Sequence, residues 1–414
     1  MVQKSGLNER LNAFEAIRKW LTQGTFFKSQ ALSPFAMELS LGVCRHHLFF
    51  LYALKKNVRK MPELKTQILI EMGFYQLFYM DSVPDYAALS ETVKTARLAE
   101  VGENNIKLIT GVLRAVQKNG FPALPPQKVA RISLQYSVPE WLVRLWLDEG
   151  GAEYAEARAQ KTVEKPAQWI RVNTRKTTLE SVRNEFRIQG REFGERFLEV
   201  PPEVKVSSLL QSPLFAGGFF SFQNPASLGV VSLLSVGPGM RVWDACAAPG
   251  GKTALLAEMD FPCRILASDI SEARIKKMDD LFARLHLDGI ETCILDVLNH
   301  SFDAEFDRIL LDVPCSNLGV VSRRPESLYR LSSDDLKSLS EMQYRILAAA
   351  SKALKPGGVL VYATCSPEPK ETTQVIRRFL RENPHFETAG KPLNSETPEP
   401  GFDQFFAQAL KRNA

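Results

Sequence analysis

The apolar residues of the first third of the chain recur with the spacing of an α-helix. Between residues 7 and 118 they return every three or four positions, as at Leu11, Phe14 and Ile17. This period is typical of helices that bury one face. An Asn-Gly pair ends the last of these segments, and a Pro-rich stretch follows it. The pattern therefore predicts an all-helical domain over residues 1–130.

The pattern changes twice after this domain. A strand-like run from Trp169 to Thr174, a helix from Leu179 to Gln189 and a strand-rich stretch from Glu192 to Val206 predict a small α+β domain over residues 131–225. Five apolar strands then alternate with helices, and these strands are residues 241–245, 264–269, 291–295, 307–313 and 358–365. Such alternation predicts an α/β fold with a doubly wound parallel sheet over residues 226–414.

Composition is that of an ordinary globular protein. Of the 414 residues, 45% are hydrophobic, and no apolar run approaches the length of about 18 residues that suggests a membrane span. The first residues lack the apolar stretch of a signal peptide. The six cysteines include no Cys-x-x-Cys pair, which argues against a disulfide framework or a zinc ribbon. We expect a cytoplasmic monomer that holds no metal and binds no membrane.

Positive charge is concentrated in the first third. Residues 1–130 hold 17 Lys and Arg against 10 Asp and Glu, whereas the whole chain has a net charge of +5. This bias suits a polyanionic partner such as a nucleic acid, although a solvated helical surface has the same pattern. A second basic group lies in the predicted α+β domain and consists of Arg171, Arg175, Lys176, Arg183, Arg187 and Arg191. It is either an RNA-facing surface or a solvated helix face.

Two cysteines stand at the ends of apolar, strand-like segments. Cys315 closes the run that starts at Ile309, and Cys365 closes the run that starts at Gly358. The carboxyl ends of strands in an open parallel sheet meet at one edge, where ligands and chemistry collect. The pair predicts covalent catalysis by a thiol beside a nucleotide-like cofactor. We expect loops at strand ends, facing helix starts, to favour the reactive thiolate.

A glycine-rich segment, Ala247–Thr253, lies between a predicted strand and a helix. It is similar to a phosphate-binding P-loop, but Cys246 stands where that loop requires a glycine, and the chain has no Gly-x-Gly-x-x-Gly. Its two adjacent glycines still allow a ligand to approach the backbone. Asp269 and Asp296 end the next two strands, where a carboxylate can bind ribose hydroxyls or an adenine amine. Together they predict a nucleoside cofactor, although each alone could be a turn or cap residue.

Three short motifs follow one another along the chain. They are Asp-Ala-Cys-Ala-Ala-Pro-Gly-Gly-Lys-Thr at 244–253, Asp-Val-Pro-Cys-Ser at 312–316 and Ala-Thr-Cys-Ser at 363–366. In this order they resemble the motifs of the NOL1/NOP2/Sun family of S-adenosylmethionine-dependent RNA cytosine-5 methyltransferases. The first third is similar to NusB-like RNA-binding domains through segments 41–45, 73–77, 87–93 and 111–114. The resemblance implies a Rossmann-like methyltransferase domain, a small α+β domain and a helical NusB-like domain, with 16S ribosomal RNA as substrate.

The resemblance also implies roles for individual residues. Cys365 would be the nucleophile that adds to the cytosine ring, and Cys315 would assist proton removal or release of the adduct. Asp312 would hold the base and stabilise the addition intermediate, and Lys252 would either support Asp312 or lie on the surface. The S-adenosylmethionine site would consist of Cys246, Ala247, Ala248, Pro249, Gly250, Gly251, Lys252, Asp269, Asp296 and Asp312.

The chain departs from the family pattern at two places. Asn224-Pro225 follows Gln223 where family members commonly carry Gln-Asp, and Arg323-Arg324-Pro325-Glu326 lacks the His and Asp of their Arg-Arg-His-Pro-Asp. We expect these changes to alter individual contacts to the cofactor and the RNA. The reactive side chains of the three motifs are all present. Arg323 and Arg324 would contact phosphates, unless they are ordinary surface arginines.

Two other functions fit parts of the sequence. A non-catalytic RNA-binding assembly or antitermination factor would depend on the helical domain and would need neither thiol. Cytosine-5 methylation of tRNA or DNA would use the same motifs on another nucleic acid. In DNA cytosine-5 methyltransferases the cysteine of the Pro-Cys motif is the nucleophile, so the DNA alternative assigns the attack to Cys315.

Overall fold

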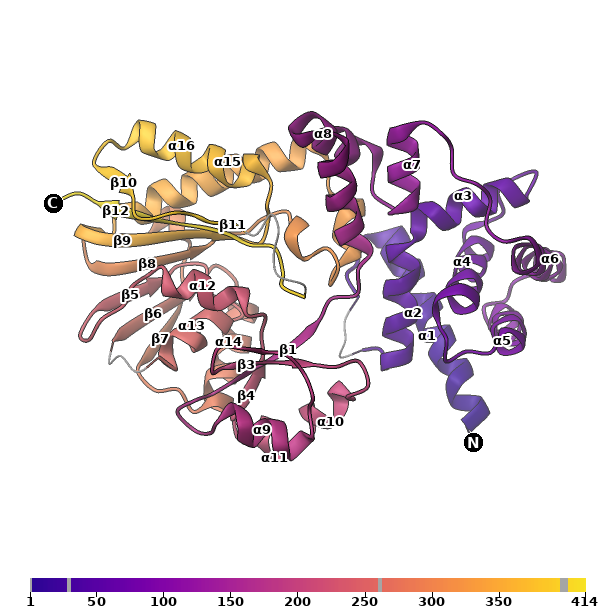
Figure 1. The fold of residues 1–414 in the computed structure, drawn as a ribbon, viewed down its shortest axis with the longest axis horizontal. Helices are drawn as coiled ribbons and strands as arrows, with labels where there is room; N and C mark the ends of the chain where they lie inside the picture. Colours follow the sequence, from indigo (N-terminus) through magenta and orange to yellow (C-terminus); the bar gives the residue numbers. More distant parts are fainter. Residues whose placement is uncertain (1, 28–30, 260–262, 395–400) are drawn as a thin grey trace. The chain divides into compact units, whose positions relative to one another are not determined.

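The chain folds into two compact units. The computed structural model describes residues 2–27, 31–259, 263–394 and 401–414 (Figure 1). The helical unit consists of Met1–Lys165 and Val321–Ser333, and the unit with the β-sheets consists of Pro166–Val320 and Asp334–Ala414. The predicted combination of an α/β fold with helices at the N-terminus is confirmed.

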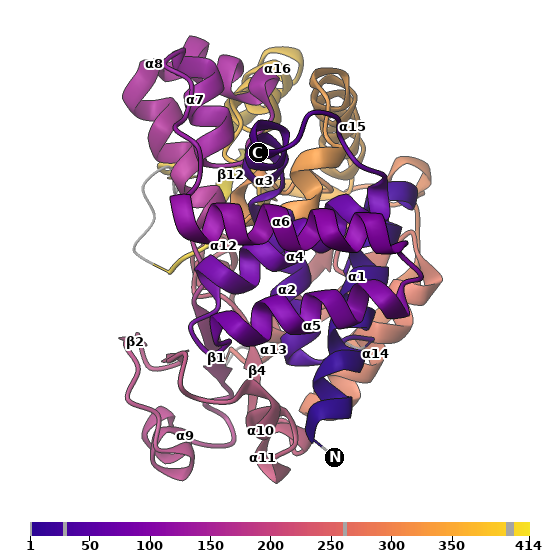
Figure 2. The same cartoon turned by 90° about the vertical axis from the view of Figure 1, so that its right-hand side faces the viewer.

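The helical unit buries the apolar faces that the sequence predicts. Its helices are α1 (Val2–Gln23), α2 (Pro34–Arg45), α3 (His47–Asn57), α4 (Leu64–Tyr79), α5 (Asp85–Leu98), α6 (Glu103–Asn119), α7 (Lys128–Gln135) and α8 (Glu140–Val163). In α6, Ile109, Val112 and Val116 are buried at helical spacing. Helices α5 and α6 lie side by side (Figure 2). Helix α4 approaches α6 closely at Gly73. A Cβ added to this glycine would lie 2.6 Å from a methyl carbon of Leu113.

A segment from the C-terminal half of the sequence also folds into the helical unit. It contains the 3-10 helix η3 (Pro325–Arg330). The hydroxyl of Tyr329 donates to the carbonyl oxygens of Cys44 (3.1 Å) and Ser137 (2.9 Å). The ring of Tyr329 packs edge-on against Trp20, with 5.4 Å between centroids. This segment, which carries Arg323 and Arg324, is therefore held by side-chain packing within the helical unit.

The predicted domain limits at residues 130 and 225 differ from this division into units. Helices α7 and α8 belong to the helical unit, and both sheets belong to the other unit. Compact units and sequence domains need not coincide, so the two limits stay a prediction.

A small antiparallel sheet opens the second unit. Its strands are β1 (Gln168–Val172), β2 (Glu192–Phe193), β3 (Phe197–Val200) and β4 (Phe220–Phe222), in the order β2-β3-β1-β4. Helices α9 (Leu179–Phe186), α10 (Val206–Leu210) and α11 (Pro213–Ala216) accompany it. Ile170, Val182 and Phe220 are buried together in its core. The α+β character predicted for this region is confirmed.

The large sheet has the order β10-β12-β9-β8-β5-β6-β7. Its strands are β5 (Arg241–Asp244), β6 (Arg264–Asp269), β7 (Ile290–Ile294), β8 (Phe306–Asp312), β9 (Leu354–Thr364), β10 (Phe386–Thr388), β11 (Leu393–Asn394), which pairs with β12, and β12 (Phe406–Arg412). Strands β5 to β9 are parallel, as predicted. Strand β12 pairs antiparallel with β9, so the sheet is mixed and the prediction of a parallel sheet is wrong at this edge.

Helices cover both faces of the large sheet (Figure 1). Helices α15 (Ser333–Ser351) and α16 (Thr373–Glu382) pack on one face. Helices α12 (Ala226–Ser232), α13 (Gly251–Ala257) and α14 (Glu272–Leu285) pack on the other. Because β5, β6, β8 and β9 are parallel, their carboxyl ends meet at one edge, where Asp244, Asp269, Asp312 and Thr364 end the strands. Among the described helices, none is both long and apolar enough to cross a membrane.

Candidate active site

The two predicted cysteines meet beyond the ends of neighbouring strands. Strands β8 and β9 are paired in parallel, with Asp312 opposite Ala363, so the loops that follow them leave the sheet together. The Sγ atoms of Cys315 and Cys365 lie 2.9 Å apart, and both residues are partly exposed. The Cys365 thiol also contacts Oδ1 of Asn317 at 3.2 Å. Both cysteines are free, as covalent chemistry on a substrate requires.

A charge pair between a largely buried lysine and a partly exposed aspartate borders the thiols. Nζ of Lys252, with a side chain 11% exposed, lies 2.5 Å from Oδ2 of Asp312. Burial alone would lower the pKa of Lys252, but the Asp312 carboxylate outweighs it and the pKa is raised. Lys252 is therefore held as a cation that supports Asp312, which is the electrostatic arrangement considered from the sequence.

The surroundings of the Cys365 thiol favour its neutral form over the thiolate. Its pKa is raised well above the ordinary value by the hydrogen bond with Cys315 and by burial, and the charge of Asp312 adds to this; Lys252 opposes the shift. The expectation that this site favours the thiolate is therefore wrong for the free chain. The physical reason is that the contact with Cys315 and the burial of the sulfur outweigh the attraction of Lys252 for a thiolate.

A buried glutamate ties the two cysteine loops together. Ser316 and Ser366, which directly follow the two cysteines, each donate a hydroxyl hydrogen bond of 2.5 Å to Oε2 of Glu371. The Ser316 N–H and Nε2 of Gln343 each donate to Oε1 at 2.9 Å. Glu371 is fully buried. One carboxylate thus accepts four hydrogen bonds and fixes the separation of the loops. Sequence reasoning missed it, since a single Glu after a Cys-Ser pair carries no distinctive signal.

Replacing Glu371 by glutamine should lower the free energy of unfolding by about 2–4 kcal/mol, because an amide nitrogen would face buried donors that lose their acceptor. Urea denaturation measures the change. Glu382→Gln, which alters an exposed carboxylate in α16, serves as control and should leave the midpoint nearly unchanged. Equal midpoints for the two variants would show that Ser316 and Ser366 do not depend on this acceptor.

The glycine-rich segment forms a tight turn into α13. Gly250 has a φ of 95° and precedes the helix, and a Cβ there would lie 2.7 Å from Cγ of Met278. In the first turn of α13, the Thr253 hydroxyl donates to Oδ2 of Asp244 at 2.6 Å. Oδ1 of Asp244 is buried and has no partner among the described residues. Burial raises the pKa of Asp244 to about 7.

Asp244 was not among the predicted cofactor residues. It ends β5, directly before the glycine-rich segment. The rule that selected Asp269 and Asp296, a carboxylate at a strand end, selects Asp244 as well. The signal was therefore present in the sequence.

The other two predicted aspartates differ in their surroundings. Asp269 is buried, accepts from the Ser271 N–H at 3.0 Å and pairs with Arg274 at 3.0 Å. Arg274 also donates to the Ala248 carbonyl at 2.5 Å, so it links Asp269 to the glycine-rich segment. Asp296 caps the 3-10 helix η1 (Val297–Asn299) by accepting from the Leu298 N–H at 3.0 Å. Its cofactor role stays a prediction beside this capping role.

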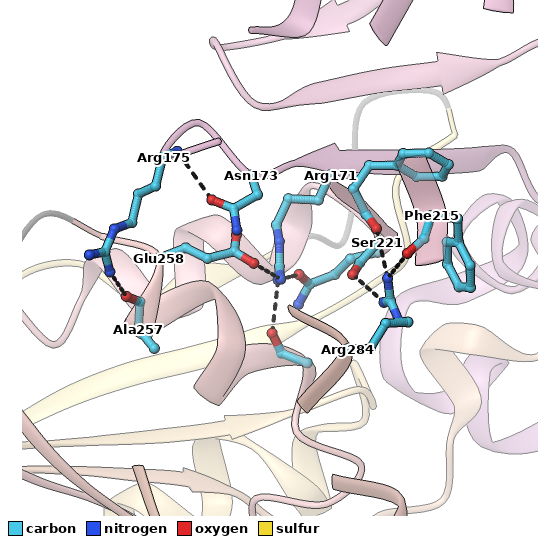
Figure 3. A network of polar contacts seen from close by, with 11 residues as sticks. Arg171, Asn173, Arg175, Phe215, Ser221, Ala257, Glu258 and Arg284 are labelled. Carbon is cyan, nitrogen blue, oxygen red and sulfur yellow. Dashed lines mark hydrogen bonds and ion pairs between the residues drawn. The ribbon is translucent and has the colours of Figure 1, made fainter. Parts of the chain in front are cut away.

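The predicted basic surface of the α+β region is largely engaged in internal contacts. Arg171 is buried, with 1% of its side chain exposed, and pairs with Glu258 (Figure 3). Arg171 cannot face RNA, so the prediction of an RNA-facing surface is wrong for this residue. Its guanidinium is buried because it pairs with Glu258, a carboxylate distant in the sequence. The other paired side chains are Arg175 with the Ala257 carbonyl, Lys176 with the Gly217 carbonyl, Arg183 with Glu192 and Arg191 with Glu199.

Comparison with known proteins identifies the family. Residues 231–409 match the family described as 16S rRNA methyltransferase RsmB/F, residues 7–118 match the NusB family, and residues 138–197 match the ferredoxin-like domain of RsmF/B-like methyltransferases. The chain is 31% identical to ribosomal RNA small subunit methyltransferase B of Klebsiella pneumoniae, over 99% of both chains. The chain belongs to the ribosomal RNA small subunit methyltransferase B family. It is also 33% identical to the probable methyltransferase B of Bacillus subtilis, over 84% of this chain and 80% of that protein.

Solved structures share the fold of this methyltransferase B family member. The crystal structure of PH0851 superposes with a TM-score of 0.77 at 22% identity, over 98% of both chains. A methyltransferase homologue from Pyrococcus horikoshii matches 70% of this chain and 100% of its own, with 27% identity and a TM-score of 0.58. The predicted family, the Rossmann-like methyltransferase fold and the NusB-like domain are confirmed.

S-adenosylmethionine is the cofactor of this methyltransferase family, as predicted. The residues at the strand ends fit it. The unpartnered Oδ1 of Asp244 suits the ammonium group of its methionine part, and the Asp269 carboxylate suits ribose hydroxyls. Gly250 and Gly251 bring the backbone within reach of a ligand at the start of α13.

Proposed function

We propose that this chain methylates carbon 5 of a cytosine in 16S ribosomal RNA through a covalent bond between Cys365 and the pyrimidine. The observation that carries the proposal is the pair of free cysteines, with sulfur atoms 2.9 Å apart, beyond the carboxyl ends of β8 and β9. The Lys252–Asp312 pair borders them. The relatives described above are named as small subunit ribosomal RNA methyltransferases, which supports the choice of RNA.

The chemistry requires a nucleophile because carbon 5 of cytosine is itself weakly nucleophilic. Attack of the Cys365 sulfur on carbon 6 moves electron density to carbon 5. S-adenosylmethionine, when bound, supplies the electrophilic methyl group. Cys315, acting as a thiolate, then takes the proton from carbon 5, the bond between sulfur and carbon 6 breaks, and Cys365 leaves as a thiolate that regains its proton from water.

Asp312 and Lys252 supply the polar side of this reaction. Asp312 lies at the end of β8, three residues before Cys315, and binds the ring nitrogen or amino edge of cytosine. Lys252 stabilises negative charge beside it, at 2.5 Å from the carboxylate. The hydrogen bond with Cys315 is the largest cause of the raised Cys365 pKa in the free chain. We expect the incoming base to break this contact, and the Cys365 proton then passes to water as the sulfur attacks. Substrate binding thus activates the nucleophile.

The target cytosine must leave its stack to reach sulfur atoms held in strand-end loops. The basic first third of the chain, which matches the NusB family, suits contact with the surrounding RNA backbone. Arg323 and Arg324 would add phosphate contacts. We propose a cytoplasmic monomer, in keeping with a ribosomal RNA substrate. A non-catalytic assembly factor is disfavoured because it would need neither free thiol.

The product of the reaction tests this proposal. The chain is incubated with S-adenosylmethionine and unmodified 16S RNA, and the nucleosides are separated by mass spectrometry after digestion. We expect 5-methylcytosine from 16S RNA and none from matched tRNA or DNA. Methylation at a ribose or at an exocyclic nitrogen would exclude the cysteine chemistry, and 5-methylcytosine in tRNA or DNA alone would exclude the ribosomal substrate.

Cofactor affinity should depend on pH through Asp244. Burial raises its pKa to about 7; Thr253 and Lys252 lower it, and Asp312 and Asp269 raise it. The carboxylate that attracts the cofactor ammonium is thus mostly protonated at pH 6 and mostly ionised at pH 8. We expect calorimetry to find S-adenosylhomocysteine binding about tenfold tighter at pH 8 than at pH 6. In Asp244→Asn the affinity should be weaker and flat with pH, and a retained pH dependence would assign the titration to another group.

A further inference from the structure

A buried ion pair joins the small sheet to helix α13. Arg171 lies on β1, and Glu258 is the residue that caps the C-terminal end of α13. Nη2 of Arg171 donates to Oε1 of Glu258 at 2.8 Å, and each side chain is 1% exposed (Figure 3). Removing two charges from water costs free energy that their attraction often fails to recover. Stability alone is therefore a weak account of this pair.

The same guanidinium also reaches the other end of α13. Nη1 of Arg171 donates to the carbonyl oxygen of Gly251 at 2.9 Å and to the side-chain oxygen of Gln223. Gly251 is the first residue of α13 and directly follows the tight turn at Gly250. The planar, rigid guanidinium of Arg171 thus forms hydrogen bonds to both the first residue and the C-cap residue of the short helix α13.

The residues held between these two ends belong to the proposed site. Lys252 pairs with Asp312, and Thr253 donates to Asp244. These contacts are 2.5 and 2.6 Å long, so a small displacement of α13 would lengthen both. The position of α13 therefore sets the geometry of the cofactor turn and of the cation beside the thiols.

We propose that Arg171 is a positioning residue that fixes α13 and thereby the cofactor turn. The small sheet acts through this side chain as a rigid support for the methyltransferase site, rather than as an RNA-binding surface at this position. The inference rests on the cofactor site of the proposed function and is independent of which cysteine attacks the base.

Arg284 offers a matched control for this role. It extends from α14 and donates to the carbonyl oxygens of Phe215 (2.7 Å) and Phe220 (3.2 Å) and to Oγ of Ser221 (2.8 Å) (Figure 3). It therefore also joins the β4 region to the large-sheet helices with a guanidinium. These hydrogen bonds end outside α13 and the glycine-rich turn.

The test compares Arg171→Lys with Arg284→Lys in the full chain. A lysine keeps the charge but cannot hold Gly251 and Glu258 at once. Calorimetry with S-adenosylhomocysteine, in the absence of RNA, should find binding at least tenfold weaker in Arg171→Lys and within twofold of wild type in Arg284→Lys. Hydrogen exchange of the α13 amides, measured without ligand, should be faster in Arg171→Lys alone.

Two results would overturn the inference. One is wild-type affinity and exchange in Arg171→Lys, and the other is equal weakening in both variants, which would reflect general loosening. If Arg171→Lys does not fold, Glu258→Gln replaces it, with binding at least threefold weaker expected and unchanged binding contradicting the role. Failure of the wild-type chain to bind S-adenosylhomocysteine would instead refute the cofactor site itself.

Discussion

Replacing Cys365 by alanine should reduce methyl transfer to 16S RNA by at least about 10,000-fold, since loss of a covalent nucleophile leaves binding and orientation but removes the route through carbon 6. The variant should keep its fold, because the substitution removes a single sulfur atom from a partly exposed residue. Single-turnover transfer of a labelled methyl group measures the rate. The unfolding midpoint, recorded in parallel, separates a chemical defect from a structural one.

Cys293 provides the control for this experiment. It is a partly exposed, free cysteine on β7, a different strand from those that lead to the thiol pair. Cys293→Ala should transfer methyl groups at the wild-type rate. A Cys365→Ala rate within tenfold of wild type would remove this residue from the chemistry and leave Cys315 as the candidate.

Replacing Cys315 by alanine should stop turnover at a later step. The Cys315 sulfur lies 2.9 Å from the Cys365 sulfur, which places it beside the carbon atoms that react. Without this base the carbon 5 proton stays in place and the bond to Cys365 cannot break. We expect turnover to fall by about 100- to 10,000-fold, the usual contribution of a general base. RNA should remain attached to the protein on a denaturing gel.

The attached RNA distinguishes this role from a structural one. A packing defect would reduce the rate and leave no adduct. The double variant Cys315→Ala with Cys365→Ala should form none, since Cys365 makes the bond. Normal turnover in Cys315→Ala, or an adduct that persists in the double variant, would refute the proposed release step.

Much of the site could be predicted because strand ends in a parallel sheet lie at one edge. Cys315 and Cys365 are 50 residues apart in sequence, yet each closes a strand-like segment. That position alone predicted that the two cysteines would lie close together. Lys252 and Asp312 came instead from the resemblance to the family, whereas the strand-end rule, applied consistently, would have reached Asp244. What the pattern could not predict was the raised pKa of the Cys365 thiol, which depends on its hydrogen bond with Cys315 and on its burial.

Contacts between side chains distant in sequence account for what was missed. Glu371 looks like an ordinary polar residue, and its role depends on donors from two loops and from Gln343. Arg171 belongs to a group of basic residues that indicates a surface. It is buried instead, because it pairs with Glu258, 87 residues away in the sequence. Strand β12 lies outside the five alternating strands that the sequence pattern predicts, and it pairs antiparallel with β9.

The central claim is that the Cys365 sulfur bonds to the pyrimidine. RNA that carries 5-fluorocytosine at the target position tests it, because fluorine at carbon 5 cannot be removed as a proton and the adduct is trapped. The protein is incubated with this RNA and S-adenosylmethionine, digested, and the modified peptide is identified by mass spectrometry. The account predicts the modification on Cys365; a modification on Cys315, or a methylated product with no trapped peptide, would contradict it.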